Sequence, residues 1–426
     1  MNKRGKPLSE TSEIAGENGR VAGEKRETPT EKVSMVATPG DGSCGIGTYT
    51  RDLQNALKQI RTEHVDIDQD QRTVGRILSL AVRAMMSDSD VVHIQHEYGL
   101  FRRKGSPYPG VMGLVLFPAL VLLNLLQRKT LIVTLHSVIN SEPGEKPRRI
   151  RYYLYIMHGL IARSADHLIF LSEECQRDFR RDISLRDDAY SVLPHGVNVS
   201  DASDTSQAEA KTQFGFDPDD TVVVIPGFVR PPKGHDIFVE AASQLPQYEF
   251  FIAGGARPKG EDADFARKIA ETADSNVTIS GVLDDDVFPT ALNAADLAFL
   301  PYRVVTQSGT FNWCVAHELP VLASDVPYFE RIRRRWGNVE TVDIGDRDEI
   351  VDRIQELLDS PERLSELQRN SRRYKRANSF ENIAALHRQI YAGERTDVPT
   401  VADESPEARS SSPRERSSTV NTGSDD

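Results

Sequence analysis

The stretch that decides the fold runs from Leu300 to Glu330 and reads LPYRVVTQSGTFNWCVAHELPVLASDVPYFE. It starts where an apolar run typical of a buried strand ends, passes through a small polar turn at 306–310, and continues as a short helix to Leu319. Pro320 ends this helix, and VLAS follows as the next strand. A helix that begins at a small-residue turn directs unpaired N–H groups and the positive end of its dipole outward, where a phosphate can bind. An ordinary βαβ unit without a ligand would show the same pattern.

A second stretch, residues 221–234, carries two cations at the end of a predicted strand. The β-branched run TVVVI is followed by PGFVRPPKG and then by a helix, HDIFVEAASQL. Arg230 and Lys233 therefore leave the carboxyl end of a buried strand, the edge at which ligands bind in an open parallel sheet. Arg offers a planar fork to phosphate oxygens and Lys a point charge. Two solvated loop cations are the alternative, but the Ser308 turn and the pair together favour a diphosphate pocket.

The segments GFVRPPKG and PYRVVTQSGTFNWCVAHELPVLASD resemble the C-terminal half of retaining GT-B glycosyltransferases of family 4, the glycosyl transferases group 1. Enzymes of this family transfer a sugar from a nucleotide diphosphate donor. The resemblance covers about residues 33–393. It implies an α/β fold of the GT-B type, with two Rossmann-like doubly wound domains and an inter-domain cleft. The alternation of strand and helix patterns after residue 221 independently favours a parallel, doubly wound sheet.

The pattern and the resemblance together predict the order of the domains. The predicted parts are a disordered segment without a signal-peptide core (1–30), an N-terminal acceptor-side Rossmann-like domain (31–200), a linker (201–220), a C-terminal nucleotide-sugar-binding Rossmann-like domain (221–376), a closing helix that returns to the N-terminal domain (377–393) and a disordered tail (394–426).

Charge and cysteine content narrow the classes of partner. The 426-residue chain has a net charge of −12, so we do not expect nucleic acid, which needs a basic face, as a partner. Cys44, Cys175 and Cys314 are far apart and odd in number, which indicates neither a disulfide framework nor a zinc site and suits a reducing compartment. We expect a cytoplasmic protein that is peripheral at the cytoplasmic membrane face.

The resemblance assigns catalytic and donor-binding roles residue by residue. The glycine-rich first loop, GDGSCGIG, precedes a helix expected from Thr48 to Ile60 and would let the backbone approach the donor; a plain mobile loop is the alternative. His136 ends the strand LIVTL, where the family's histidine lies beside the donor sugar; a structural histidine is the alternative. Catalytic roles fall on Arg230, Lys233 and His136, and donor binding falls on Gly45, Gly47, Gly227, Ser308, Gly309, Thr310 and Glu330.

Two further motifs resemble the acceptor side of the family's cleft. HIQHE places His96 and Glu97 at a strand end, and LPHGVN supplies His195 and Asn198 at the crossing between domains. HIQHE is not a metal signature, because His93 and His96 point to opposite faces of a strand. We expect His93 to be a core residue. Neither a metal nor a cofactor is expected, since fixed cations can neutralise a leaving diphosphate.

One departure from the family concerns its paired carboxylates. The two glutamates that the family carries eight residues apart fall on Val305 and Trp313 here. Contacts usually given to those carboxylates, with the donor's sugar hydroxyls and ribose, are therefore in question. Glu318 and Gln307 are candidate replacements.

An apolar segment lies between basic clusters in the N-terminal half. Val111–Leu126 is shorter than the roughly 20 residues needed to span a bilayer, so a buried helix is one interpretation. The other is a monotopic membrane contact, since Arg102–Lys104 precede the segment and Arg128 and Lys129 follow it. A second basic cluster with interleaved tyrosines, Lys146–Tyr155, would fit anionic lipid heads or a lipid-linked acceptor.

The function that these observations predict is transfer of a hexose from a nucleotide-diphosphate sugar to a glycan or lipid-linked acceptor with retention of configuration. A GT-B relative that binds a nucleotide sugar without catalysis is the main alternative, and the missing carboxylates favour it a little. A phosphorylase, an epimerase and a structural scaffold also remain open.

Overall fold

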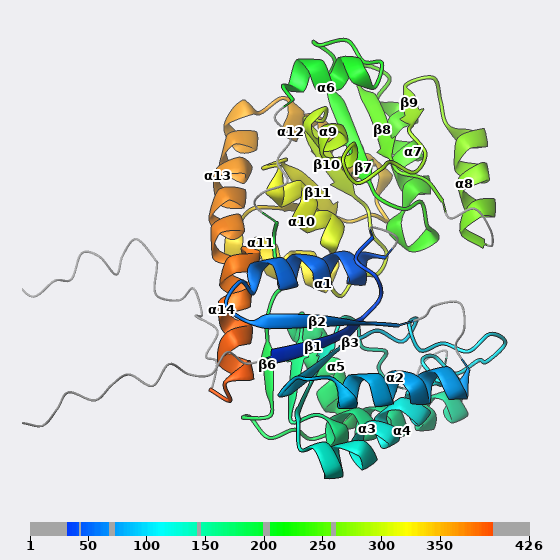
Figure 1. The fold of residues 1–426 in the computed structure, drawn as a ribbon. Helices are drawn as coiled ribbons and strands as arrows, with labels where there is room; N and C mark the ends of the chain where they lie inside the picture. The colour runs from blue at the N-terminus through cyan, green and yellow to red at the C-terminus, as the bar shows by residue number, and fades with distance from the viewer. Residues whose placement is uncertain are drawn as a thin grey trace, which may run out of the picture. The chain divides into compact units, whose positions relative to one another are not determined.

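The structure is a computed structural model that describes residues 32–41, 44–67, 73–142, 146–198, 205–256 and 261–394. Two six-stranded parallel sheets, each flanked by helices, form this part of the chain (Figure 1). The prediction of two doubly wound α/β sheets is confirmed. The disorder expected at 1–30 and 394–426 falls on residues outside the described part, except for residue 394.

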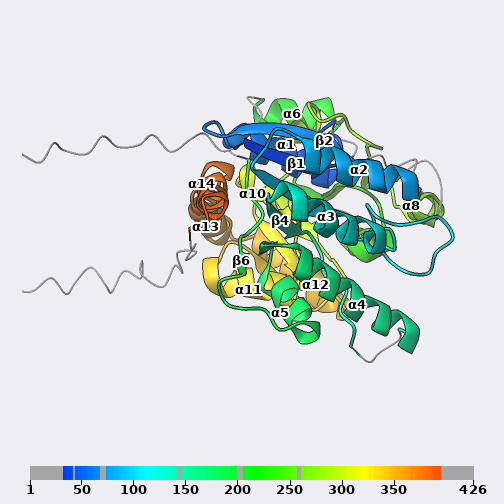
Figure 2. The ribbon, with the colours of Figure 1, turned by 60° about the horizontal axis from the view of Figure 1, so that its bottom comes forward.

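The N-terminal half forms the first sheet, in which β1 lies between β2 and β3. Helices α2, α3 and α4 lie side by side (Figure 2). The strands, in sheet order, are β2 (Arg61–Asp66), β1 (Lys32–Ala37), β3 (Val91–His96), β4 (Thr130–Leu135), β5 (His167–Phe170) and β6 (Tyr190–Val192). The helices are α1 (Gly45–Ala56), α2 (Val74–Met86), α3 (Gly113–Gln127), α4 (Arg148–Ser164) and α5 (Glu173–Asp182).

The C-terminal half forms the second sheet, in which β7 lies between β10 and β8. Its strands, in sheet order, are β12 (Glu340–Val342), β11 (Val321–Ser324), β10 (Leu297–Leu300), β7 (Val222–Pro226), β8 (Glu249–Ala253) and β9 (Val277–Ile279). Its helices are α6 (Gln207–Gln213), the 3-10 helix η1 (Pro231–Lys233), α7 (His235–Gln244), α8 (Glu261–Thr272), α9 (Phe288–Asn293), α10 (Gly309–Ala316), α11 (Pro327–Trp336), α12 (Arg347–Leu358) and α13 (Pro361–Ala377). In the described part of the expected linker, 205–220, the chain forms α6.

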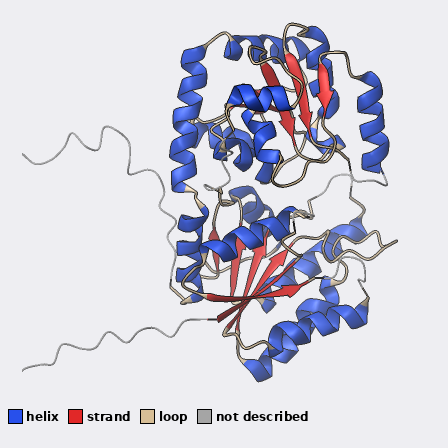
Figure 3. Ribbon diagram, turned by 45° about the horizontal axis from the view of Figure 1, so that its top comes forward, coloured by secondary structure: helices blue, strands red, loops and turns tan. Residues whose placement is uncertain are grey.

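Both faces of the second sheet are buried, which explains the unbroken apolar sequence of β7. Successive side chains of a strand point to opposite faces. Val222 and Val224 accordingly pack in one core cluster, while Val223 and Ile225 pack in another. Helices therefore cover the sheet on both sides (Figure 3), as parallel sheets require.

The chain's closing helix, α14 (Phe380–Tyr391), packs against the first sheet. The hydroxyl oxygen of Tyr391 in this helix lies 2.7 Å from Nδ1 of His93. His93 is fully buried, which confirms the prediction that it is a core residue. A bridge between Val197 and Ser379 fixes the segment that leads into this helix.

Each sheet has a point at which its strand order reverses direction, and ligands bind at the carboxyl ends of strands there in open α/β sheets. In the second sheet this point lies between β7 and β10, which are hydrogen-bonded neighbours. In the first sheet it lies between β1 and β3. The predicted site residues that follow β7, β10 and β3 therefore leave the sheets at the positions where ligands are expected.

The apolar segment expected at Val111–Leu126 forms α3, which is buried on one face only. Leu116, Phe117 and Leu120 belong to the core, whereas Leu125 and Leu126 are exposed. Among the described residues, none of the helices is both long and apolar enough to cross a membrane.

Candidate functional site

The turn after β7 is shaped by two glycines in the left-handed region. Gly227 has φ +95° and Gly234 has φ +74°, conformations that other residues rarely adopt. A Cβ atom at Gly234 would collide with the carbonyl oxygen of Pro301, so the turn packs directly on the end of β10. Between the two glycines, the η1 turn carries Lys233, whose side chain is half-buried.

Lys233 is the centre of the candidate site. Its ammonium nitrogen lies 3.1 Å from Oγ1 of Thr310, 3.5 Å from the carbonyl oxygen of Pro226 and 5.4 Å from the ring centroid of Tyr302. A Cβ atom at Gly227 would lie only 2.7 Å from this nitrogen, so glycine leaves the space that the ammonium group occupies. Burial lowers the pKa of Lys233 to about 8.

The N-terminus of α10 meets the same point. Ser308 caps the helix by accepting a hydrogen bond from the backbone N–H of Phe311 at 3.0 Å. Gly309 and Thr310 form the first turn, two residues earlier than the sequence predicted. The first N–H groups of a helix lack partners within it, and the dipole end is positive. A positive helix end and a buried ammonium group thus converge with no carboxylate paired to Lys233 in the described part of the chain, which favours an anion between them.

Arg230 has a different setting from Lys233. Its side chain is about half exposed, and Nε lies 3.3 Å from the carboxylate of Asp262 in α8. Its positive charge contributes to the lowered pKa of Lys233, so the two cations are near each other. Asp262 thus compensates part of the charge of Arg230.

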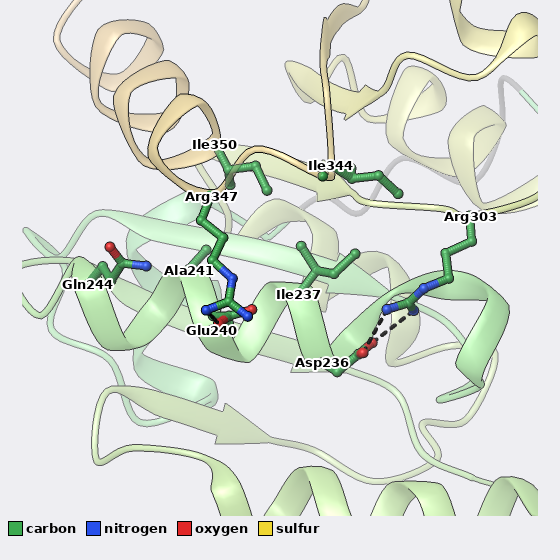
Figure 4. Close-up of a pocket in the computed structure, with 10 residues that line it drawn as sticks. Asp236, Ile237, Glu240, Ala241, Gln244, Arg303, Ile344, Arg347 and Ile350 are labelled. Carbon is green, nitrogen blue, oxygen red and sulfur yellow. Dashed lines mark hydrogen bonds and ion pairs between the residues drawn. The ribbon is translucent and has the colours of Figure 1, made fainter.

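Arg303, which sequence reasoning missed, braces this turn from the end of β10. Its guanidinium donates to both carboxylate oxygens of Asp236 at 2.9 and 2.7 Å and to the carbonyl of Pro231 at 2.9 Å (Figure 4). These groups border a groove of about 440 Å³ between α7 and the start of α12. Arg347 pairs with Glu240 in the same groove, so its charges are already compensated. Lys233, which has no paired carboxylate in the described ranges, is therefore a better candidate for binding an anion than this groove.

His136 lies at the end of β4 as predicted, and Gln95 orients it. Nε2 of His136 lies 2.9 Å from Oε1 of Gln95, whose amide nitrogen lies 3.4 Å from Nε2 of His93. Because an amide oxygen only accepts and its nitrogen only donates, His136 carries its proton on Nε2 and leaves Nδ1 as an acceptor. Burial lowers the pKa of His136 to about 3, so the ring is neutral at pH 7.

His195 connects the first-sheet residues with α10. Its Nδ1 lies 3.0 Å from Nδ2 of Asn312, and this amide also donates to the His195 carbonyl at 3.1 Å. Tyr49 from α1 packs edge-on to the rings of both His195 and His136, at 4.8 and 5.0 Å. A Cβ atom at Gly309 would lie 3.7 Å from Nε2 of His195, so this histidine faces the first turn of α10. Half-buried Asn198 follows on the same segment.

The two residues of the HIQHE motif have separate settings. His96 is fully buried, stacks on Phe101 at 5.5 Å and also contacts the rings of Tyr98 and Phe117. Its contact with an acceptor stays a prediction, and in the structure α3 and its preceding loop cover the ring. Glu97 is half-buried at the edge of the sheet, where its carboxylate accepts from Ser137 at 3.3 Å.

Two of the four glycines of the predicted loop are helical, contrary to the prediction, whereas Gly40 precedes the helix. Gly45 and Gly47 lie in the first turn of α1, which ends at Ala56 rather than at Ile60. A Cβ atom at Gly47 would collide with the carbonyl oxygen of Pro39, whereas one at Gly45 would have nothing within 4 Å. Gly47 thus permits close packing of α1 on the turn after β1, and Gly45 leaves open space. Gly42, from the same cluster, lies outside the described residues.

The predicted donor ligand Glu330, the candidate replacement Glu318 and the glutamate position Trp313 each contact other side chains of the second half of the chain. Glu330 in α11 accepts from Arg333 at 3.0 and 3.1 Å, and this arginine lowers its pKa. Glu318 pairs with Arg372 of α13 at 2.6 Å, so it does not replace a family carboxylate. Trp313 packs edge-to-face on Phe288 at 5.6 Å, so its indole belongs to the core layer around α10.

No group of three or more His, Cys, Asp or Glu side chains is placed to hold a metal ion in the ranges that the structure describes.

The residues that sequence reasoning missed are Arg303, Tyr302, Gln95 and Tyr49. One signal could have identified Tyr302 and Arg303, since both directly follow the apolar run LAFLP at the end of β10. Gln95 and Tyr49 act through packing between distant segments, which no local pattern reveals.

Comparison with known proteins agrees with this geometry. Residues 220–360 match the family described as glycosyl transferases group 1. The chain is 24% identical over 242 residues to the alpha-D-kanosaminyltransferase of Streptomyces kanamyceticus, and the aligned part covers 54% of this chain and 61% of the relative. It is 25% identical over 206 residues to the alpha-galactosylglucosyldiacylglycerol synthase of Streptococcus pneumoniae, which covers 47% of this chain and 54% of the relative. The chain thus matches between half and two thirds of the length of these curated relatives.

Solved structures resemble the fold over most of the described chain. HepE of Anabaena, in complex with UDP and glucose, has a TM-score of 0.65 at 16% identity and covers 85% of this chain and 99% of its own. Sucrose-phosphate synthase of Thermosynechococcus elongatus has a TM-score of 0.66 at 19% identity, with 85% and 100% covered. Such likeness at low identity shows the fold. The chain therefore has a GT-B fold, and its second half carries a domain that matches the glycosyl transferases group 1.

Proposed function

We propose that this protein transfers a hexose from a nucleotide-diphosphate sugar to a hydroxyl group of a glycan or lipid-linked acceptor, with retention of configuration. The observation that carries the proposal is the convergence of Lys233, Gly227 and Thr310 at the reversal point of the second sheet. A buried ammonium group, a glycine that clears space for it and a helix N-terminus together suit a diphosphate.

In the proposed reaction the fixed cations stabilise the leaving diphosphate. Lys233 and the amides near Ser308, Gly309 and Thr310 would hold its oxygens as negative charge develops. Arg230 would join after exchanging Asp262 for the phosphate. Gly227 would leave room for the ammonium group that holds the diphosphate, and no step needs a cofactor.

The proposed sugar-facing groups come from the first sheet. Neutral His136 would accept a hydrogen bond from a donor hydroxyl through Nδ1, since Gln95 occupies Nε2. Gly45 would allow the donor to approach α1, where a side chain is not needed for packing. Glu97, His195 and Asn198 are the acceptor-side candidates that keep some exposure. Glu330 would need to release Arg333 before it could contact a donor.

The acceptor proposal draws on the relatives. Their names specify transfer of a kanosaminyl group, synthesis of a galactosylglucosyldiacylglycerol and, for several mycobacterial proteins, a glycosyl transfer that involves D-inositol 3-phosphate. An HepE structure contains UDP-glucose. These names support a nucleotide-sugar donor for this chain and leave lipid-linked and glycan acceptors as the proposed classes.

The alternative is a nucleotide-sugar-binding relative without catalysis. Val305 and Trp313 occupy the positions of the family's glutamates, so neither position offers a carboxylate to a ligand. The Trp313 ring packs against Phe288. This replacement removes two candidate contacts to the donor sugar.

A panel of UDP-, GDP- and ADP-linked hexoses, each assayed for donor consumption with and without acceptors, tests the proposal. We expect consumption of one donor, with the anomeric proton of the product showing the donor's configuration by NMR. Saturable binding of a nucleotide sugar without turnover would instead support the binding relative. An inverted product would refute retention, and absence of both binding and turnover across the panel would refute the donor site.

A further inference from the structure

Three neighbouring helices carry nearly all the exposed large apolar side chains of this protein. Among the described residues, twelve of the fifteen such side chains belong to α2, α3 and α4. Scattered exposed apolar residues are normal, but a contiguous group marks an interaction surface. The α2–α4 face is defined by Val74, Leu78, Val82, Met86, Leu114, Val121, Leu122, Leu125, Leu126, Tyr152, Tyr155 and Ile156.

These side chains form stripes along each helix, and the helices are adjacent. On α2 the exposed residues recur every fourth position from Val74 to Met86, which places them on one side of the helix. On α3 the most exposed are Leu125 and Leu126, at 70% and 80%. α3 packs between α2 and α4, and the three helices lie side by side in both views (Figures 1 and 2). The stripes therefore belong to one side of the first domain.

The same segments contain no acidic residue, although the chain carries 64. There is no Asp or Glu in residues 74–86, 98–129 or 147–164. Exposed cations flank α3 in the chain and begin α4, namely Arg102, Arg103, Lys104, Arg128, Arg148 and Arg149. Lys129, which the sequence placed in this group, is instead buried and donates to Ser87 and Ser89. A cationic border on a protein of net charge −12 indicates a negatively charged partner.

We propose that the α2–α4 face docks on an anionic lipid surface. Apolar side chains with tyrosines and arginines at their border match helices that lie in the interface between headgroups and acyl chains. Each basic residue near an anionic leaflet adds attraction that salt screens. A second copy of this chain is the less suitable occupant, because two such faces would bring their arginines together. The proposal rests on the first sheet alone and does not depend on sugar transfer.

Flotation of the full chain with vesicles tests this surface. We expect binding to vesicles of phosphatidylcholine with phosphatidylglycerol, weak binding to phosphatidylcholine alone, and release as salt is raised. The double variant Leu125→Asp/Leu126→Asp should lower the bound fraction at least about tenfold, since it places charges where apolar side chains would enter the interface. Val304→Asp is the matched control, because Val304 is 73% exposed but belongs to the second half of the chain.

The variants also define what would overturn the proposal. Arg102→Glu/Arg103→Glu should shift half-release to lower salt without changing the circular dichroism spectrum. Equal binding to neutral and anionic vesicles, equal losses in the double variant and in Val304→Asp, or no flotation with either vesicle would each overturn it. A dimer that the double variant dissociates, in a protein that binds no vesicle, would assign the face to a second copy.

Discussion

The pKa of Lys233 makes the proposed diphosphate site testable by pH. Burial lowers this pKa to about 8, and the ammonium form is the one that attracts a diphosphate. If the ligand binds only the protonated site, its dissociation constant rises by the factor 1 + 10^(pH − 8). Affinity for UDP should thus change little between pH 7 and 7.5 and fall about tenfold by pH 9. The phosphate's last ionisation, with a pKa of about 6, is largely complete at pH 7, so the test covers the range from pH 7 to 9.

Other groups around Lys233 do not titrate in the same window. Burial raises the pKa of Cys314 to about 12 and also raises that of Tyr302, while it lowers that of His235 to about 3. Within this cluster, Lys233 alone changes charge between pH 7 and 10. Because UDP would pull the ammonium pKa upward, binding near pH 8 should also take up a proton.

Calorimetric titration with UDP in two buffers of different ionisation enthalpy measures both the affinity and the proton uptake. Lys233→Met should bind more weakly at pH 7 and lose the slope between pH 7 and 9, whereas Lys268→Met, at an exposed lysine of α8, should keep both. A wild-type affinity that stays constant from pH 7 to 9.5 would refute the reasoning, as would a slope that survives in Lys233→Met. For the ligand-free protein the sign is opposite. The unfolded chain keeps this proton up to about pH 10.4, so folding stability from this group rises with pH above 8.

Two of three further predictions use matched pairs of variants. Gly227→Ala should weaken UDP binding more than tenfold and lower stability, whereas Gly215→Ala, at an equally positive φ with nothing near its added Cβ, should lower stability alone; equal UDP affinities in the two variants would contradict this. Gly47→Ala should lower the free energy of unfolding by about 1–3 kcal/mol through overpacking, while Gly45→Ala should be close to neutral, as denaturant titration will show. Arg303→Lys should lower UDP affinity severalfold by loosening the turn that it braces, and unchanged affinity in calorimetry would remove its positioning role.

The sequence contained enough to predict both sheets and the central part of the site. Strand patterns with continuous burial, such as that of β7, are explicit in the chain, and the residues directly after a strand must lie at the sheet edge. That rule placed Lys233, Thr310 and His136 correctly at strand or helix ends. Their mutual distances, by contrast, depend on the strand order, which places β7 beside β10.

What the sequence could not predict depends on contacts between distant segments. Alternation indicates that His96 faces one side of β3, but only the packing of α3 shows that this side is buried. In the sequence Arg230 is an unpaired cation that could bind phosphate, whereas in the structure it pairs with Asp262 of another helix. The glycines at the start of α1 suggested a loop, because the close approach of Pro39 that requires Gly47 is a tertiary contact.

The surroundings of Lys233 bear on how the proposed donor would bind. In the described structure the ammonium group has a hydroxyl, a carbonyl and an aromatic ring around it, and no carboxylate pairs with it there. Under the proposed function this cation would hold the diphosphate, while the hydroxyl contacts that the resemblance gives to carboxylates at Val305 and Trp313 would be missing. It follows that the diphosphate, rather than the hexose, should supply most of the donor's affinity. UDP and UDP-glucose should then bind within about tenfold of each other, and a preference for the sugar nucleotide above a hundredfold, about 2.7 kcal/mol, would show that other groups such as His136 replace the lost carboxylates.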